Sequence, residues 1–104
     1  DEATVVGSFI GQKLVVNEFV AYGDFMPYLA EDTCLYMSEK SKAIVAFALC
    51  GFANLSSIAI LLGGLGGIAP SRRAEIAKFG LLAVAAGTLS NLMSATIVGL
   101  FLSI

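Results

Sequence analysis

The chain has 104 residues, of which 58% are hydrophobic and only 13% are charged, and its formal net charge is −2. Because soluble domains carry roughly 25% charged residues, this composition excludes an ordinary soluble globular domain, and the slight acidic excess argues against a nucleic-acid-binding surface. The absence of His rules out a Ser-His-Asp triad and a His-ligated metal centre within this chain.

Residues 1–23 are predicted to form a re-entrant helical hairpin. Lys13 and Glu18 interrupt their apolar runs, each of which is shorter than the ~20 residues that a spanning helix needs. A single spanning helix would carry one of these charges through lipid. Two short helices that enter and leave on the same side avoid that cost, because irregular backbone is tolerated at membrane depth when protein covers it.

Residues 24–37 are predicted to form an extracytoplasmic loop, because Pro27 opposes a regular helix and acidic residues punctuate the segment. The acidic residues are Asp24, Glu31 and Asp32. Cys34 in this loop and Cys50 after it lack the spacing of a CxxC motif, so both are expected to be inert. Cys50 is expected to be a buried small hydrophobe.

Residues 38–68 are predicted to form a transmembrane helix that is broken near 51–54. The window 43–71 contains no charged residue and is too long for one straight crossing of a ~30 Å hydrocarbon core. A glycine, Gly51, and several small polar residues interrupt it near its middle. Free backbone groups at such breaks bind substrates in transporters, whereas small polar residues also join membrane helices. Both interpretations apply to Phe52, Asn54, Ser56 and Ser57.

Residues 72–104 are predicted to form one continuous C-terminal transmembrane helix, since 79–104 contains no charged residue. The basic residues Arg72, Arg73 and Lys78 lie at its start, so the positive-inside rule places this link in the cytoplasm and the acidic loop outside. Polar residues along the helix are expected to face other helices. These residues are Thr88, Ser90, Asn91, Ser94 and Thr96.

Glu18 is the strongest candidate for a functional side chain, because apolar residues flank it on both sides. A carboxylate at membrane depth is costly and usually lines a pathway or a ligand site. Two structural alternatives stay open: Glu18 reaches the membrane interface, or it pairs with Lys13.

Two long motifs resemble the concentrative nucleoside transporter family, and its bacterial sodium-coupled members in particular. The first motif is GQKLVVNEFVAY at 11–22, and the second is ALCGFANLSSI at 48–58. The resemblance implies that 1–23 is the second re-entrant hairpin, 38–68 the broken seventh membrane helix and 72–104 the eighth. It also implies a homotrimer, in which these segments belong to a mobile transport domain.

The resemblance implies a role for four residues as well. Glu18 matches the family's ribose-binding carboxylate, Asn54 and Ser57 match polar residues that also hold ribose, and Phe52 matches an apolar neighbour of the substrate. Sodium, the coupling ion, and the base would be bound mainly by the remainder of the transporter. No other cofactor is expected.

The sequence is therefore interpreted as the C-terminal part of a sodium-coupled nucleoside symporter, an all-α, multi-pass protein of the bacterial inner membrane, with lipid, nucleoside and sodium as partners and without nucleic acid. One alternative is a small membrane protein that acts through helix association, using Gly63 and Gly67. A membrane enzyme with Glu18 as acid or base is disfavoured, because no paired carboxylate or activated nucleophile accompanies it. The chain is thus predicted not to be an enzyme.

Overall fold

The structure is a computed structural model that describes residues 1–30 and 35–104. Every regular element in these two ranges is helical, in agreement with the predicted all-α class. In chain order the elements are α1 (Glu2–Val15), α2 (Glu18–Leu29), α3 (Glu39–Leu49), α4 (Leu55–Ile68), the 3₁₀ turn η1 (Pro70–Arg72) and α5 (Arg73–Phe101).

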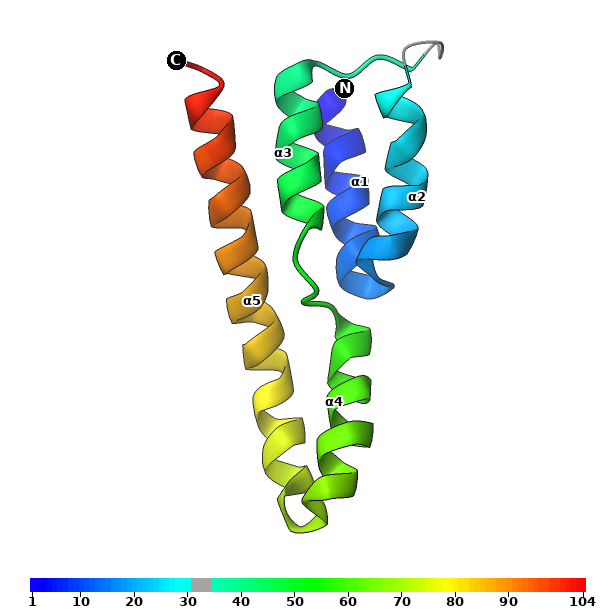
Figure 1. Cartoon of the computed structure of the whole chain (residues 1–104), viewed down its shortest axis with the longest axis vertical. Helices are drawn as coiled ribbons and strands as arrows, with labels where there is room; N and C mark the ends of the chain where they lie inside the picture. The colour runs from blue at the N-terminus through cyan, green and yellow to red at the C-terminus, as the bar shows by residue number, and fades with distance from the viewer. Residues whose placement is uncertain (31–34) are drawn as a thin grey trace.

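The helices form an elongated bundle whose longest dimension is 52 Å. Figure 1 shows α1 and α2 as an antiparallel hairpin beside α3, with α4 continuing beyond the hairpin tip and α5 returning along the full length. Both chain termini lie at one end of the bundle, and the turn between α4 and α5 lies at the other. The hairpin tip, the end of α3 and the start of α4 consequently meet partway along the long axis.

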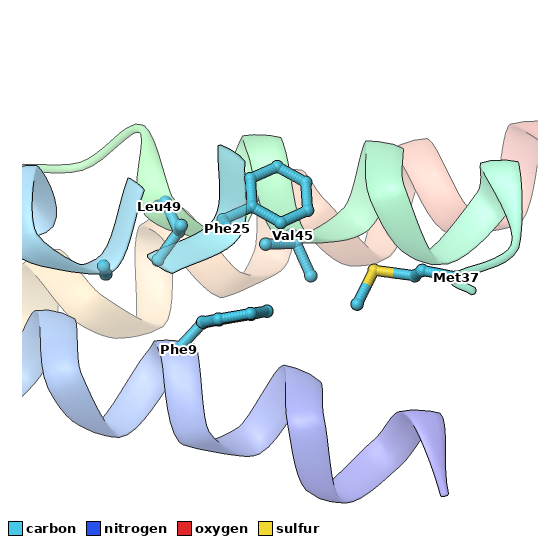
Figure 2. Close-up of a cluster of buried hydrophobic side chains, with 6 residues drawn as sticks. Phe9, Phe25, Met37, Val45 and Leu49 are labelled. Carbon is cyan, nitrogen blue, oxygen red and sulfur yellow. The ribbon is translucent and has the colours of Figure 1, made fainter. Parts of the chain in front are cut away.

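A small apolar core joins the hairpin to α3. Its buried members are Phe9, Ala21, Phe25, Met37, Val45 and Leu49. Figure 2 shows the labelled side chains of α1, α2 and α3, together with that of Met37 just before α3, in the space between the helices. The ring of Phe9 packs edge-on against both Phe25 and Tyr28, with centroid separations of 5.6 Å in each case. This aromatic packing fixes α1 against α2.

The predicted loop over 24–37 is wrong for its first part, because α2 continues through Pro27 to Leu29. Proline usually disrupts a helix interior. Here the turns around it bury Phe25 and place Tyr28 against the core, and this packing offsets the local cost. Residues 31–34, which include Glu31, Asp32 and Cys34, lie outside the described residues.

α3 ends at Leu49 and α4 begins at Leu55, and the interval between them lies against α5. A Cβ atom added at Gly51 would come within 2.7 Å of the Asn91 side chain, so only glycine allows this close approach. Cys50, expected to be buried, is exposed, because it follows the last helical residue of α3.

The run Pro70–Phe101 has 32 residues and is long and apolar enough to cross a membrane, by length and composition. α4 is apolar but shorter, at 14 residues. The two helices approach closely at Gly80, where an added Cβ would meet Ile58 at 2.7 Å, and at Gly66, which lies under the Arg73 side chain. Gly63 and Gly67, expected to mediate helix packing, have no such neighbour within 4 Å among the described residues.

The polar residues of α5 only partly follow the prediction that they face other helices. Asn91 donates a hydrogen bond to a carbonyl of α3. Ser94 and Thr96 instead donate to carbonyls of their own helix, four residues earlier. Their hydroxyls therefore satisfy backbone groups locally and contribute no link between helices.

Candidate functional site

Asn54 caps the start of α4 and is only 1% exposed. Its Oδ1 accepts a hydrogen bond from the Ser57 N–H at 2.8 Å, and the Ser57 hydroxyl accepts from the Asn54 N–H at 3.2 Å. This reciprocal arrangement is a capping box, which satisfies two backbone donors at a helix start. Asn54 and Ser57 are thereby held rigidly at the break between α3 and α4.

The start of α2 places Glu18 opposite Asn54. Asn17 caps α2 by accepting from the Val20 N–H at 2.9 Å, and Glu18 is the first helical residue. Because the Asn54 Oδ1 is used in the cap, its Nδ2 is the atom that faces Glu18 and donates to Oε2 at 3.3 Å. A carboxylate acceptor and an amide donor from two helix starts therefore meet at one place.

A second contact ties the hairpin tip to α4. The Ser56 hydroxyl donates to the Val16 carbonyl at 2.9 Å. Val16 is the C-cap of α1 and directly precedes the Asn17 cap of α2. The hairpin tip and the start of α4 are thus joined by two contacts, Ser56 to Val16 and Asn54 to Glu18.

Phe52 differs from Asn54 in its exposure. Its side chain belongs to the interval before α4 and is 62% exposed. The structure therefore joins Glu18, Asn54 and Ser57 by hydrogen bonds, and the ring of Phe52, two residues before Asn54, is largely accessible.

From the sequence, Lys13 is predicted only to interrupt an apolar run and to be an alternative ion-pair partner of Glu18. It lies in the last turn of α1, is 2% exposed, and its Nζ donates to the Ala48 carbonyl at 2.8 Å. The ion pairs in the described parts of the chain join Lys42 to Glu39 and Arg72 to Glu75, so the alternative in which Glu18 pairs with Lys13 is not what these residues form.

Asn91 and Tyr22 also donate hydrogen bonds to carbonyls near the C-terminal end of α3. The Asn91 Nδ2 donates to the same Ala48 carbonyl, and the Tyr22 hydroxyl donates to the Ala46 carbonyl at 2.8 Å. Lys13 can be singled out in the sequence for the same reason as Glu18, because a cation among apolar residues at membrane depth is also costly. The sequence predicts that Asn91 faces other helices, but no local pattern identifies its acceptor, which lies 43 residues earlier in the chain.

Across residues 1–30 and 35–104, no group of three or more acidic, thiol or imidazole side chains is placed to hold a metal ion. The chemistry available at the site is therefore hydrogen bonding by one carboxylate, one carboxamide and the hydroxyls of Ser56 and Ser57. Such a set recognises a polar ligand with both donors and acceptors.

Comparison with known proteins identifies the family. Residues 1–99 match the model for the C-terminus of Na⁺-dependent nucleoside transporters. The chain is 53% identical over 103 residues to nucleoside permease NupC of Helicobacter pylori, covering 99% of this chain and 25% of that protein. The chain belongs to the concentrative nucleoside transporter family.

Other relatives of this transporter family agree in sequence and in structure. An uncharacterised transporter of Haemophilus influenzae is 62% identical over 103 residues, covering 99% of this chain and 25% of that protein. The solved structure of CNTnw in an inward-facing substrate-bound state superposes with a TM-score of 0.94 at 57% identity, covering 99% of this chain and 25% of CNTnw.

The chain spans about a quarter of the length of these family members, and it corresponds to their C-terminal segment. The relatives are transporters and permeases, so the prediction that the chain is not an enzyme is confirmed. Its match to a transporter structure likewise identifies it as part of a membrane protein.

Proposed function

We propose that this chain forms the ribose-binding half of a midplane nucleoside site in a sodium-coupled nucleoside symporter. The observation that carries the proposal is the approach of Glu18 to Asn54, which joins the starts of two helices at the end of a short helical hairpin. We propose nucleoside as the substrate and sodium as the coupling ion because the chain belongs to the family of Na⁺-dependent nucleoside transporters.

The chemistry of the site suits a sugar. Each ribose hydroxyl is both a donor and an acceptor, so it can donate to the Glu18 carboxylate while accepting from the Asn54 amide. The direct Asn54–Glu18 contact is 3.3 Å long, against ~2.9 Å for a typical N–H···O bond, and a ribose hydroxyl placed between the two groups would satisfy both of them. The exposed ring of Phe52 would cover an apolar part of the substrate.

The proposed membrane arrangement follows the helix lengths. α1 and α2, with 14 and 12 residues, would each be roughly 18–21 Å long, which suits a re-entrant hairpin. α3 and α4 would form one crossing interrupted at 50–54, and α5 a second. We place this assembly in the bacterial inner membrane, as part of the transport domain of a homotrimer, with sodium bound mainly by the rest of the transporter.

The alternative of a small protein that acts through helix association depends on Gly63 and Gly67, near which the described residues place no atom within 4 Å of an added Cβ. The match of residues 1–99 to the transporter family favours the transporter over this alternative.

The experiment is to replace Glu18 by Gln in the complete transporter and to measure nucleoside affinity. Glu18→Gln keeps the shape but removes the charged acceptor, and hydrogen bonds to charged groups contribute ~1.5–3 kcal/mol. Affinity should therefore fall by roughly 10- to 100-fold. Glu39→Gln is the matched control, because Glu39 is an exposed acid in the first turn of α3. The transporter with this substitution should bind nucleoside with wild-type affinity. Wild-type affinity in Glu18→Gln would contradict the proposal.

A further inference from the structure

The Ala48 carbonyl accepts two side-chain hydrogen bonds from two different helices. Lys13 Nζ reaches it from α1 at 2.8 Å, and Asn91 Nδ2 reaches it from α5. α3 ends one residue later, so this carbonyl belongs to the last turn, whose carbonyls have no N–H donor within the helix. The interrupted end of α3 is thus anchored both to the hairpin and to the last helix.

Lys13 is the more demanding of the two anchors, because burying an ammonium group is costly unless polar groups compensate it. Its residue is 2% exposed. The C-terminal end of a helix carries partial negative charge, which stabilises a cation placed there. The position of the ammonium at the end of α3 therefore explains how a lysine is accommodated in this apolar surrounding.

The anchor is connected to the candidate site through a closed set of contacts. Lys13 lies about one turn before the hairpin tip, and Glu18 lies directly after the tip. On the other side, 50–54 leads from the end of α3 to Asn54, which donates to Glu18. The bond from Ser56 to the Val16 carbonyl closes the same set. Any shift of the end of α3 relative to the hairpin tip would therefore change the Glu18–Asn54 separation.

We propose that Lys13 is a positioning residue for the nucleoside site. Its buried ammonium holds the end of α3 against the hairpin and so sets the distance between Glu18 and Asn54. Asn91 supports the same carbonyl from α5. This inference rests on the proposed function, since it assigns Lys13 to the site formed by those two residues.

The test uses the complete transporter with Lys13→Met, which keeps an unbranched side chain, one atom shorter, and removes its charge and donors. Lys13→Arg restores a cationic donor, and Lys78→Met is the matched control, since Lys78 is an exposed cation on α5. Two quantities are measured: hydrogen–deuterium exchange of the amides at 46–58, and the dissociation constant of a ribonucleoside. The same constant is measured with Glu18→Gln alone and combined with Lys13→Met.

We expect Lys13→Met to speed exchange at 46–58 and to weaken ribonucleoside binding by about tenfold, as loss of one charge-assisted hydrogen bond would. Lys13→Arg should recover most of the affinity, and Lys78→Met should match the wild type. In the Glu18→Gln background, Lys13→Met should weaken binding much less, because residues that act through a shared contact are not additive.

Three results would overturn the inference: unchanged exchange, faster exchange with unchanged affinity, or full additivity with Glu18→Gln. Failure of the proposed function has a different signature, namely wild-type affinity in Glu18→Gln. If Lys13→Met does not fold, Asn91→Leu provides the test, because it removes the other donor to Ala48. It should also speed exchange at 46–58 and weaken binding, and normal values of both would overturn the inference.

Discussion

At the scale of single residues, Asn54 performs two tasks with the two ends of its carboxamide. Oδ1 accepts from the Ser57 N–H and caps α4, while Nδ2 donates to Glu18. The cap therefore decides which atom faces the carboxylate. A substitution that removes both atoms would confuse the stability of α4 with recognition of the ligand, so the two tasks need separate variants.

Asn54→Ser should separate them. Serine is as good an N-cap as asparagine, but its hydroxyl is too short to replace the Nδ2 donor. Asn54→Ser should fold with wild-type stability and bind a ribonucleoside roughly 5- to 100-fold more weakly, since an unpaired buried polar group costs ~1–3 kcal/mol. Asn54→Ala should show the same loss of affinity and an additional loss of ~0.5–2 kcal/mol in stability.

Deoxynucleosides complete this test. If Glu18, Asn54 and Ser57 surround the sugar, a 2′- or 3′-deoxy analogue that lacks the contacted hydroxyl should lose less affinity in Asn54→Ser than the ribonucleoside does. The preference between two bases should change little. Lost base preference with intact deoxy discrimination would show that this segment does not contact the ribose.

The sequence predicts the local part of this site and not the distant part. The break that carries Asn54 and Ser57 is visible in the sequence, because Gly51 and small polar residues interrupt an apolar run, and the structure adds the capping box that these two residues form. The carboxylate of Glu18 is equally conspicuous among apolar residues. The contact from Lys13 to Ala48 spans 35 residues and depends on how the hairpin packs against α3, which no local pattern encodes.

At the scale of the helices, α1 is joined to α3 by polar contacts at both ends. Near the N-termini, the Glu2 carboxylate accepts from the Ser38 N–H at 3.1 Å and from the hydroxyls of Ser38 and Ser41. Near the C-termini, Lys13 donates to Ala48. Since lipid weakens the hydrophobic drive for helix association, these polar contacts help to keep the two parallel helices in register.

The contact at Glu2 predicts a dependence on pH. Hydrogen bonds from Ser41, and then from Ser38, lower the pKa of Glu2 below its ordinary value. A lowered pKa in the folded state means that the contact stabilises the fold above the pKa of the unfolded chain, about 4.3, and that this stabilisation is lost as pH falls through the folded-state value. Glu2→Gln should therefore lower the melting temperature at pH 7 and leave it nearer to that of the wild type at pH 3.

The control for this prediction is Glu39→Gln, which removes an acid of the same region that pairs with Lys42 at the surface. Exposed pairs contribute little, so its melting curve should follow that of the wild type at both pH values. An equal deficit of Glu2→Gln at pH 7 and pH 3 would show that the ionised carboxylate is not what stabilises this junction.

Pro27 illustrates why helix boundaries are harder to predict than helices. The residue pattern at 24–29 favours a loop, because Asp24 and Pro27 both disfavour a helix interior. In the structure, the Gln12 side chain donates to Asp24 at 2.7 Å, and Phe25 is buried against Phe9. Contacts from α1 therefore extend α2 beyond the point where its own sequence would end it.

At the scale of the whole molecule, large apolar side chains remain exposed along α4 and α5. Examples are Ile60, Leu82, Leu89 and Leu100, all more than 60% exposed. The composition predicts this, since a chain with so few charged residues cannot cover its apolar surface. Which of these faces contact lipid and which contact the rest of a transporter depends on neighbours that the sequence of this chain does not contain.

We predict the orientation of the molecule from its two ends. The α4–α5 turn carries Arg72 and Arg73 at one end of the 52 Å axis, and the segment before α3 lies at the other end (Figure 1). A hydrocarbon core is only ~30 Å thick, so the two ends are expected to lie in different aqueous compartments. The positive-inside rule assigns the α4–α5 turn to the cytoplasm.

Single cysteines at the two ends test this orientation. Tyr36 is 82% exposed before α3, and Ser71 is exposed in the turn between α4 and α5. In a complete transporter without other cysteines, an impermeant thiol reagent added to intact spheroplasts should label Tyr36→Cys at once and Ser71→Cys only after permeabilisation. If α1 and α2 form a re-entrant hairpin, its tip lies at membrane depth. Val16→Cys at the tip should therefore be labelled more slowly than Tyr36→Cys or Ser71→Cys, whichever side the reagent is added from. Labelling of Ser71→Cys from outside, with Tyr36→Cys protected, would reverse the orientation while leaving the helix arrangement intact, because the two positions would still lie on opposite sides.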